Sequence, residues 1–208
     1  MNPDRTDKRL PALLWSCALF GGLALGLAVS PFQFPDEPHH FAAAMIQAWG
    51  DGEREAIEAE TIRLMDRSDW WTLTGMGRPA RLPERISEVK FLMADSASED
   101  FRDRIQGFVL YHRIAGAMIA LTGARDPAVA FFFLRFLSLA FLLAGLAFLS
   151  LALKTIAGAW DAELRGVFAL AVFLPQLAYA GIGVSPDMFV FFLGAAFFWA
   201  AAGIIASK

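Results

Sequence analysis

The sequence predicts an all-α integral membrane protein with four transmembrane helices and a long, helical external segment after the first of them. Composition is the first reason: of 208 residues, 57% are hydrophobic and 19% are charged, whereas an average soluble domain is about 45–50% apolar and about 25% charged. The second reason is that apolar residues form runs of about 19 residues or more, which can span a bilayer as a helix. The third is that charge is concentrated between Ser30 and Asp126, a stretch that holds 11 of the 18 basic and 16 of the 21 acidic residues.

These properties exclude several classes of protein. The apolar runs exclude a soluble single domain and, for most of the chain, a disordered protein. The net charge is −3 and there is no basic tail, which argues against nucleic acid as a partner. The single cysteine, Cys17, cannot form an internal disulfide, and the presence of only three histidines limits any histidine-based metal site.

The first apolar run, Pro11–Val29, predicts a transmembrane helix. Its 19 residues extend about 28 Å as a helix, close to the thickness of the hydrocarbon core. The run is longer than the apolar core of a signal peptide, which is usually about 7–15 residues, so we expect a retained anchor. Arg5, Lys8 and Arg9 precede it and place residues 1–10 in the cytoplasm.

Three further spans are predicted: Pro127–Ala152, Gly166–Val184 and Met188–Ala206. The loop 153–165 carries Lys154 and Arg165, and short basic loops prefer the cytoplasm. Residues 30–126 and the turn 185–187 are then external. In a bacterium this topology corresponds to a multi-pass protein of the inner membrane.

The segment Gly107–Thr122 is apolar but has only 16 residues and contains His112 and Arg113. A helix of this length extends about 24 Å, which is short for a span. If it crossed the membrane, the basic loop 153–165 would be external, against the charge bias. We therefore expect a helix that lies in, or dips into, the outer membrane interface.

The rest of the external segment also reads as helical. A helix is expected to start at the sequence Pro35-Asp36-Glu37-Pro38, with an acidic cap and a proline in its first turn. It should run to about Trp49 and stop at Gly50. Phe41, Met45, Ala48 and Trp49 share one face, so this helix is expected to lie against the membrane surface.

Two more helices and a loop are predicted downstream. Glu53–Arg67 reads as a more charged helix with Ile57, Leu64 and Met65 as its apolar residues. Ser68–Pro83 is rich in glycine and proline and reads as a loop. A third helix is expected over Glu84–Ala94.

Asp36, Glu37 and Asp187 are the candidate catalytic residues. Adjacent carboxylates at a membrane surface could act as general base or metal ligand, and a cap of the following helix is an equally weighted alternative for Asp36 and Glu37. Asp187 precedes the fourth span, which it could also cap. In the four-span topology all three carboxylates lie on the same side at the same depth, which favours a shared site.

The histidines offer a weaker alternative. His39 and His40 follow Asp36 by three and four residues and can face the same way on a helix. A divalent metal held by Asp36, Glu37, His39 and His40 is therefore conceivable. Because few further ligands are apparent, we favour the alternative in which these histidines are simply solvated.

Arg135 lies nine residues into the second span, where a charge is costly and usually has a partner or a function. Its guanidinium could bind a lipid phosphate, and His112 and Arg113 could contact the same anion. Snorkelling of Arg135 toward the outer surface is an equally weighted alternative. Pro175 in the third span is expected to produce a kink.

These motifs resemble the N-terminal part of the polytopic type C (GT-C) glycosyltransferases, in particular the bacterial relatives of protein mannosyltransferases and of the aminoarabinose transferase of lipid A. Phe34–Phe41 is similar to the acidic motif that follows the first span of that family, Arg135–Ser138 to its Arg-x-x-Ser pattern, and Tyr179–Asp187 to the stretch with a second external aspartate. The family often carries a His/Lys-Pro-Pro element where residues 104–108 stand here without proline. Such enzymes continue into further spans, so the chain is expected to be a truncated or partial form.

The resemblance implies inverting transfer of a sugar from a polyprenyl-phosphate donor to a lipid or glycan acceptor outside the membrane. Asp36 would be the general base, Glu37 would assist or bind a metal, and Asp187 would support the site. Arg113 or Arg135 would stabilise the polyprenyl phosphate as it leaves. A non-catalytic binding or assembly subunit with the same architecture is the alternative, and a transporter fragment is disfavoured because the spans hold only one charge.

Overall fold

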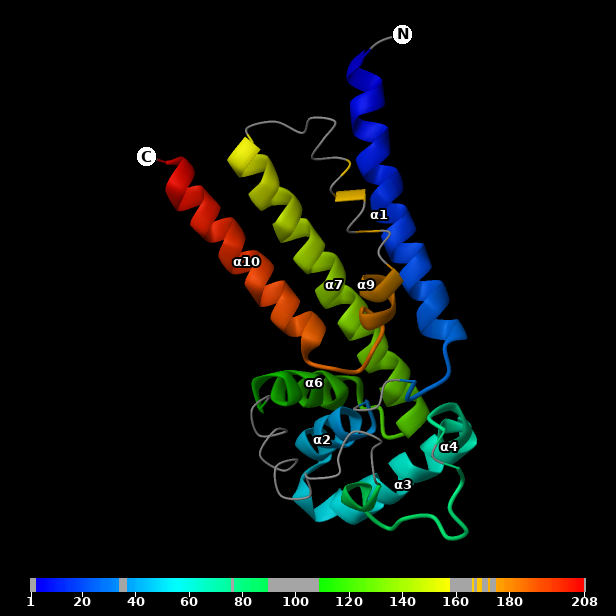
Figure 1. The fold of residues 1–208 in the computed structure, drawn as a ribbon. Coiled ribbons are helices and arrows are strands. Elements are labelled where there is room, and N and C mark those ends of the chain that lie inside the picture. The colour runs from blue at the N-terminus through cyan, green and yellow to red at the C-terminus, as the bar shows by residue number, and fades with distance from the viewer. Residues whose placement is uncertain are drawn as a thin grey trace. The chain divides into compact units, whose positions relative to one another are not determined.

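The computed structural model describes residues 3–33, 37–75, 77–89, 109–157, 166, 168–169, 172 and 175–207, without the side chains of residues 3–12, 87, 175, 176 and 178. Within these ranges the regular structure is helical and there is no strand, as expected (Figure 1). The helices are α1 (Pro3–Ala28), α2 (Glu37–Trp49), α3 (Arg54–Arg67), α4 (Trp70–Leu73), α6 (Val109–Thr122), α7 (Pro127–Ala157), α9 (Pro175–Ala180) and α10 (Asp187–Ala206), with single 3-10 turns at Asp51–Glu53 and Ile86–Glu88.

The chain divides into two compact units. One, here called the apolar unit, comprises Met1–Ala28, Ser138–Ile182 and Asp187–Lys208. The other, here called the α2–α6 unit, comprises Val29–Leu137 and Gly183–Pro186. Helix α7 contributes its first third to the α2–α6 unit and the remainder to the apolar unit.

Two of the described helices, α7 with 31 residues and α10 with 20, are long and apolar enough to cross a membrane. Leu13–Ala28 of α1 and the whole of α6 are apolar but shorter. Both long helices begin within one residue of their predicted starts, and α10 ends at Ala206 as predicted, whereas α7 continues past Ala152 to Ala157. The loop predicted at 153–165 thus begins with five helical residues, and 158–165 lie outside the described residues.

The apolar unit is held together by aliphatic and aromatic side chains. Leu139, Leu142 and Leu146 lie on one face of α7, at spacings of three and four residues, and pack with Leu14 of α1. A Cβ on Gly22 of α1 would collide with the side chain of Leu139, so the glycine allows α1 to approach α7 closely. Four ring pairs among the described residues join α7 to α10, with centroids 5.2–5.8 Å apart: Phe141–Phe189, Phe141–Phe192, Phe148–Phe192 and Phe148–Trp199.

The predicted end of the third span is wrong. Helix α9 ends at Ala180, and Gly181–Pro186 form turns rather than helix, so the connection to α10 is longer than the three residues 185–187. Hydropathy did not reveal this end because Ile182 and Val184 are as apolar as the helix before them. Pro175 is the first residue of α9, a position that suits a residue without a backbone N–H.

Helix α2 is the central helix of the α2–α6 unit. It begins at Glu37, ends at Trp49 and is followed by Gly50 with φ +95°, as predicted. Phe41 and Met45 are buried, so the expectation that this stripe lies on the membrane surface is wrong. The stripe meets protein instead, and Phe41 forms an aromatic cluster with Phe32 and Phe131, whose ring centroids lie 4.6–5.7 Å apart.

Helix α6 packs along α2 (Figure 1). A Cβ on Gly116 would lie 2.6 Å from Gln47 Cβ and 2.9 Å from the Ala44 carbonyl oxygen, so only glycine fits at this crossing. The face of α6 toward α2 is buried, whereas Leu110 and Leu121 on its other side are exposed.

Helix α3 confirms the predicted charged helix, with Ile57 and Met65 buried. The predicted loop Ser68–Pro83 contains one short helix, α4, because Trp70 and Trp71 are buried against the unit. The helix predicted over Glu84–Ala94 is wrong where it is described: only Ile86–Glu88 form a 3-10 turn, and Val89 is extended. Residues 90–94 lie outside the described residues.

Candidate functional site

A buried polar cluster lies at the start of α2. Glu37 is the first residue of this helix, and its side chain is fully buried. The backbone N–H of Val184 donates a hydrogen bond to Glu37 Oε1, with an N···O distance of 2.8 Å. This bond joins the acidic motif to the turn that precedes α10 in the sequence.

Arg135 of α7 lies near the second carboxylate oxygen of Glu37, Oε2. Its guanidinium donates hydrogen bonds to the carbonyl oxygens of Val29 and Ser30 (2.7 Å to Ser30), and Arg135 Nη2 lies 3.8 Å from Glu37 Oε2. The guanidinium also lies 4.7 Å from the centre of the Phe131 ring. A buried charge is costly unless it is paired and hydrogen-bonded, and these contacts provide both.

These contacts decide between the alternatives for Arg135. Its side chain is fully buried, so the snorkelling alternative is wrong. The expectation that the charge has a partner is confirmed, and that partner is Glu37. The planar fork of the guanidinium is directed at two backbone carbonyls, a geometry in which it serves the protein rather than an external phosphate.

The histidines are also buried. His39, His40 and His112 are between 3% and 9% exposed, so the expectation of solvated histidines is wrong. His40 Nδ1 and His112 Nε2 are 3.0 Å apart and share a hydrogen bond between α2 and α6. The rings are stacked, with centroids 5.3 Å apart.

Burial sets the charge state of these rings. It lowers the pKa of His112 to about 4 and that of His39 to about 3, with a smaller contribution in each case from the neighbouring charge of His40. Burial acts in this direction because it penalises the charged imidazolium. Both side chains are therefore neutral at physiological pH.

The described part of the chain contains no group of three or more His, Cys, Asp or Glu side chains that could hold a metal ion. Of the four predicted metal ligands, Glu37 is directed at Arg135 and Val184 and His40 at His112. Asp36 lies outside the described residues. The described residues thus do not fit a metal site, and we assign no step to a metal.

The remaining predicted residues have different surroundings. Asp187 is the exposed first residue of α10, in the apolar unit, where an acidic side chain complements the positive end of the helix. Arg113 is exposed on α6. The structure therefore brings Glu37, Arg135 and the turn before Asp187 together, and it brings His112 to His40 instead of to the arginines.

Sequence reasoning missed the partners of this cluster. The carbonyl oxygens of Val29 and Ser30 and the amide of Val184 are backbone groups, which leave no signature in side-chain chemistry. The one available signal was Arg135 itself, an isolated charge in an apolar helix, which predicted a partner without identifying it.

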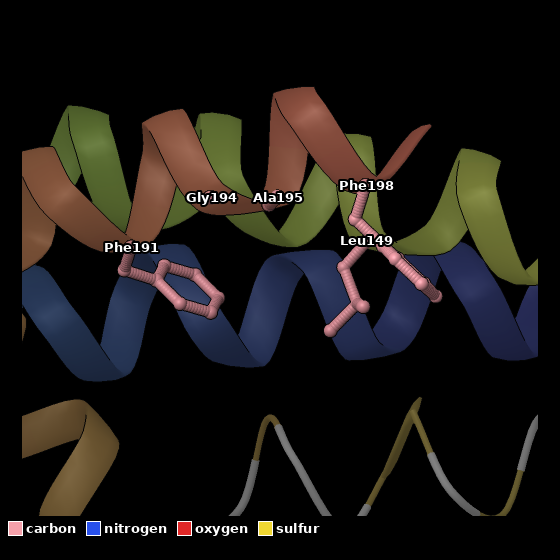
Figure 2. A pocket seen from close by; sticks show the side chains of 5 residues that line it. All are labelled: Leu149, Phe191, Gly194, Ala195 and Phe198. Atoms are coloured by element: carbon pink, nitrogen blue, oxygen red, sulfur yellow. The ribbon is translucent and has the colours of Figure 1, made fainter. Parts of the chain in front are cut away.

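The described part of the chain also has hollows, and two of them are lined by other residues. The larger is an open apolar groove of about 280 Å³ between α7 and α10 (Figure 2), lined by Leu149, Phe191, Gly194, Ala195 and Phe198. The smaller, about 110 Å³, lies among α2, α3 and the segment before α7, where Arg125 stacks 4.5 Å from the centre of the Trp49 ring. Neither hollow contains any of the predicted site residues.

Comparison with known proteins gives no match among family models, curated proteins or solved structures.

Proposed function

We propose that this chain is a membrane glycosyltransferase-like protein that transfers a sugar from a polyprenyl-phosphate donor to a lipid or glycan acceptor on the external face of a bacterial inner membrane. The proposal rests on the acidic motif at residues 36–37 and on Asp187. The coarser conclusion, a helical protein with two helices long and apolar enough to span a membrane, stands without it.

One observation carries the proposal: the hydrogen bond from Val184 N–H to Glu37 Oε1. It connects positions 147 residues apart in the sequence. Glu37 is adjacent to Asp36, and only Ser185 and Pro186 separate Val184 from Asp187. The bond therefore supports the proposal, because it joins the start of α2, next to the acidic motif in the sequence, to the turn that precedes Asp187 in the sequence.

In the proposed reaction Asp36 is the general base. It takes the proton from the acceptor hydroxyl as the oxygen attacks the anomeric carbon of the sugar. The bond between that carbon and the phosphate oxygen breaks, and polyprenyl phosphate leaves as an anion. Attack from the face opposite the leaving group inverts the configuration of the anomeric carbon.

A cation is needed where the phosphate leaves. Arg135 is committed to Val29, Ser30 and Glu37, whereas Arg113 is exposed on α6. We therefore assign stabilisation of the leaving phosphate to Arg113. The neutral, buried His112 next to it in the sequence is directed at His40.

The length of α7 supports an external position for the α2–α6 unit. Its 31 residues extend about 46 Å as a helix, and about 11 of them exceed the number that the hydrocarbon core of about 30 Å requires. The segment Pro127–Leu137, which includes Arg135, belongs to the α2–α6 unit. We infer that this segment projects beyond the hydrocarbon, so that Arg135 lies in protein rather than in lipid.

The apolar outer face of α6 supports the same topology. Leu110 is 59% and Leu121 82% exposed, although the opposite face of the helix is buried in protein. Such a helix is suited to the membrane interface, with Arg113 near the headgroups. This placement and the basic residues before α1 support the proposed four-span topology, in which the N-terminus is cytoplasmic and the α2–α6 unit external.

The decisive experiment replaces Asp36 with asparagine in the full chain. Loss of a general base costs about 10²–10⁴-fold in rate, so transfer from a panel of polyprenyl-phosphate sugars should fall by at least about 100-fold. Asp51→Asn is the matched control, because Asp51 is exposed and pairs only with Arg54 among the described residues. Wild-type transfer by Asp36→Asn would reject the assigned role, and recovery of a membrane partner with both variants would then favour the non-catalytic subunit.

A further inference from the structure

We propose that Glu37 and Arg135 are positioning residues, which hold the segment before α2 and the turn before α10 together so that the acidic motif has one fixed orientation. This inference deepens the proposed function and rests on it for the role of Asp36. It assigns Glu37 a task different from assistance in proton transfer, and Arg135 a task different from phosphate binding.

The cluster joins four chain segments that are far apart in the sequence. They are residues 29–30, the start of α2 at Glu37, α7 at Arg135 and the turn at Val184. All four belong to the α2–α6 unit.

Both oxygens of Glu37 are directed at protein groups. Oε1 accepts from Val184 N–H at 2.8 Å, and Oε2 faces Arg135 at 3.8 Å. The side chain is fully buried, so an acceptor hydroxyl has no path to it in this arrangement. A carboxylate in these surroundings orients the described backbone around it, which is the start of α2 and the turn at Val184.

The chemistry of the cluster requires arginine. Arg135 Nη1 donates to the Val29 carbonyl oxygen and Nη2 to the Ser30 carbonyl oxygen, and Nη2 also lies near Glu37 Oε2. A planar guanidinium with several fixed donors can serve these partners together, whereas a lysine ammonium is a single point charge. Arg135→Lys is therefore expected to weaken the cluster although it keeps the charge.

Hydrogen exchange of the full chain in lipid nanodiscs tests the tether without any assay of transfer. In Glu37→Ala the Val184 amide loses its acceptor, and exchange of the segment 181–186 should become about tenfold faster. Glu37→Gln retains a carbonyl oxygen for the same bond and should stay within about threefold of wild type. Glu53→Gln is the control, because Glu53 is exposed and paired with Arg125.

Unchanged exchange of this segment in Glu37→Ala would overturn the proposal. If Glu37→Ala does not fold, Arg135→Lys takes its place, and exchange at wild-type rates would again overturn the proposal. If exchange responds as expected while wild-type protein transfers no sugar, the tether stands and the proposed function fails.

Kinetics distinguish positioning from catalysis. Glu37→Ala, which breaks the tether, should lower kcat about tenfold, leave KM for the donor unchanged and keep the acid limb of the pH profile, which belongs to Asp36. Arg135→Lys should lower kcat to a similar extent, and the double variant should lose little more, because the two residues act as a unit. Disappearance of the acid limb in Glu37→Gln would identify Glu37 as the base and overturn the proposal.

Discussion

Single buried side chains carry much of the chemistry of the α2–α6 unit. Glu37 and Arg135 neutralise each other, and Arg135 satisfies two carbonyl oxygens in addition. His39 and His112 are kept neutral instead, because burial lowers the pKa of each. The unit therefore shows both common ways to bury an ionisable side chain at low cost: a charged side chain is paired, or the side chain is kept neutral.

The histidines predict a pH dependence of stability. An imidazole whose pKa is lowered by folding binds fewer protons in the folded chain than in the unfolded chain, so stability rises with pH. The contribution of His112 is complete above its unfolded pKa of 6.5 and is lost progressively as the pH falls to its folded pKa of about 4. Thermal unfolding between pH 7.5 and 4.5 should show a decline in Tm that is smaller in His112→Gln. Parallel curves for the two proteins would contradict this prediction.

At the scale of elements, helix packing in the α2–α6 unit depends on close approach between α2 and α6. Gly116 is the residue that permits it, and the hydrogen bond between His40 and His112 spans the same pair of helices. One face of α6 is consequently buried in protein, while its other face presents leucines outward.

Gly116→Val should therefore destabilise the protein. Its side chain would meet Gln47 and the backbone of α2, and overpacking of this kind costs about 1–3 kcal/mol. Gly52→Ala is the control, because a Cβ there has no neighbour within 4 Å, and its effect should stay within about 0.5 kcal/mol. Chemical unfolding of both variants measures the difference, and equal stabilities would show that α6 can shift away from α2 without cost.

The outer face of α6 predicts contact with the membrane interface. A spin label at Leu121, introduced as Leu121→Cys in a Cys17→Ser background, should be more accessible to dissolved oxygen than to a water-soluble nickel chelate. Arg63, exposed on the polar surface of α3, is the control position and should show the opposite preference. A label at position 121 that prefers the chelate would place this face of α6 in water.

At the scale of the whole molecule, α7 contributes to both units, with Pro127–Leu137 in one and the rest in the other. A helix of 31 residues exceeds by about three turns the length that the hydrocarbon core of a bilayer requires. The helix thus combines a fully buried arginine with a length and apolarity sufficient to cross a membrane.

The topology has its own test. In a Cys17→Ser background, Asp187→Cys should react with a membrane-impermeant maleimide in intact cells, whereas Lys208→Cys should react only after permeabilisation. The reason is that the proposed four spans place the start of α10 outside and its end inside. Labelling of position 187 only after permeabilisation would overturn both the topology and the shared site of Asp36 and Asp187.

Local sequence patterns were sufficient for three of the helices. Helix α2 ends at Trp49 before Gly50, α3 covers the charged stretch, and α10 ends at Ala206, as predicted. Helix formation and termination depend on nearby residues, which the sequence shows directly. Only two of the four predicted spans are confirmed as helices long and apolar enough to cross a membrane, and the number of spans, the topology and the proposed reaction stay predictions.

Periodicity could not reveal what each apolar face meets. Phe41 and Met45 share a face, as predicted, but lipid and a protein core both favour apolar side chains, and only packing showed that this face meets protein. Hydropathy likewise missed the end of α9 at Ala180, because the turn after it is also apolar.

The sequence by itself determined the helical class, the apolar runs and the candidate residues, since these follow from composition and local pattern. Tertiary structure alone decided that Arg135 pairs with Glu37, that Val184 donates to the same carboxylate and that His40 meets His112. The physical reason is distance along the chain: the hydrogen bonds of this cluster and of the histidine pair join positions 72 to 147 residues apart. Such partners are brought together only when the helices pack, and no local pattern records them.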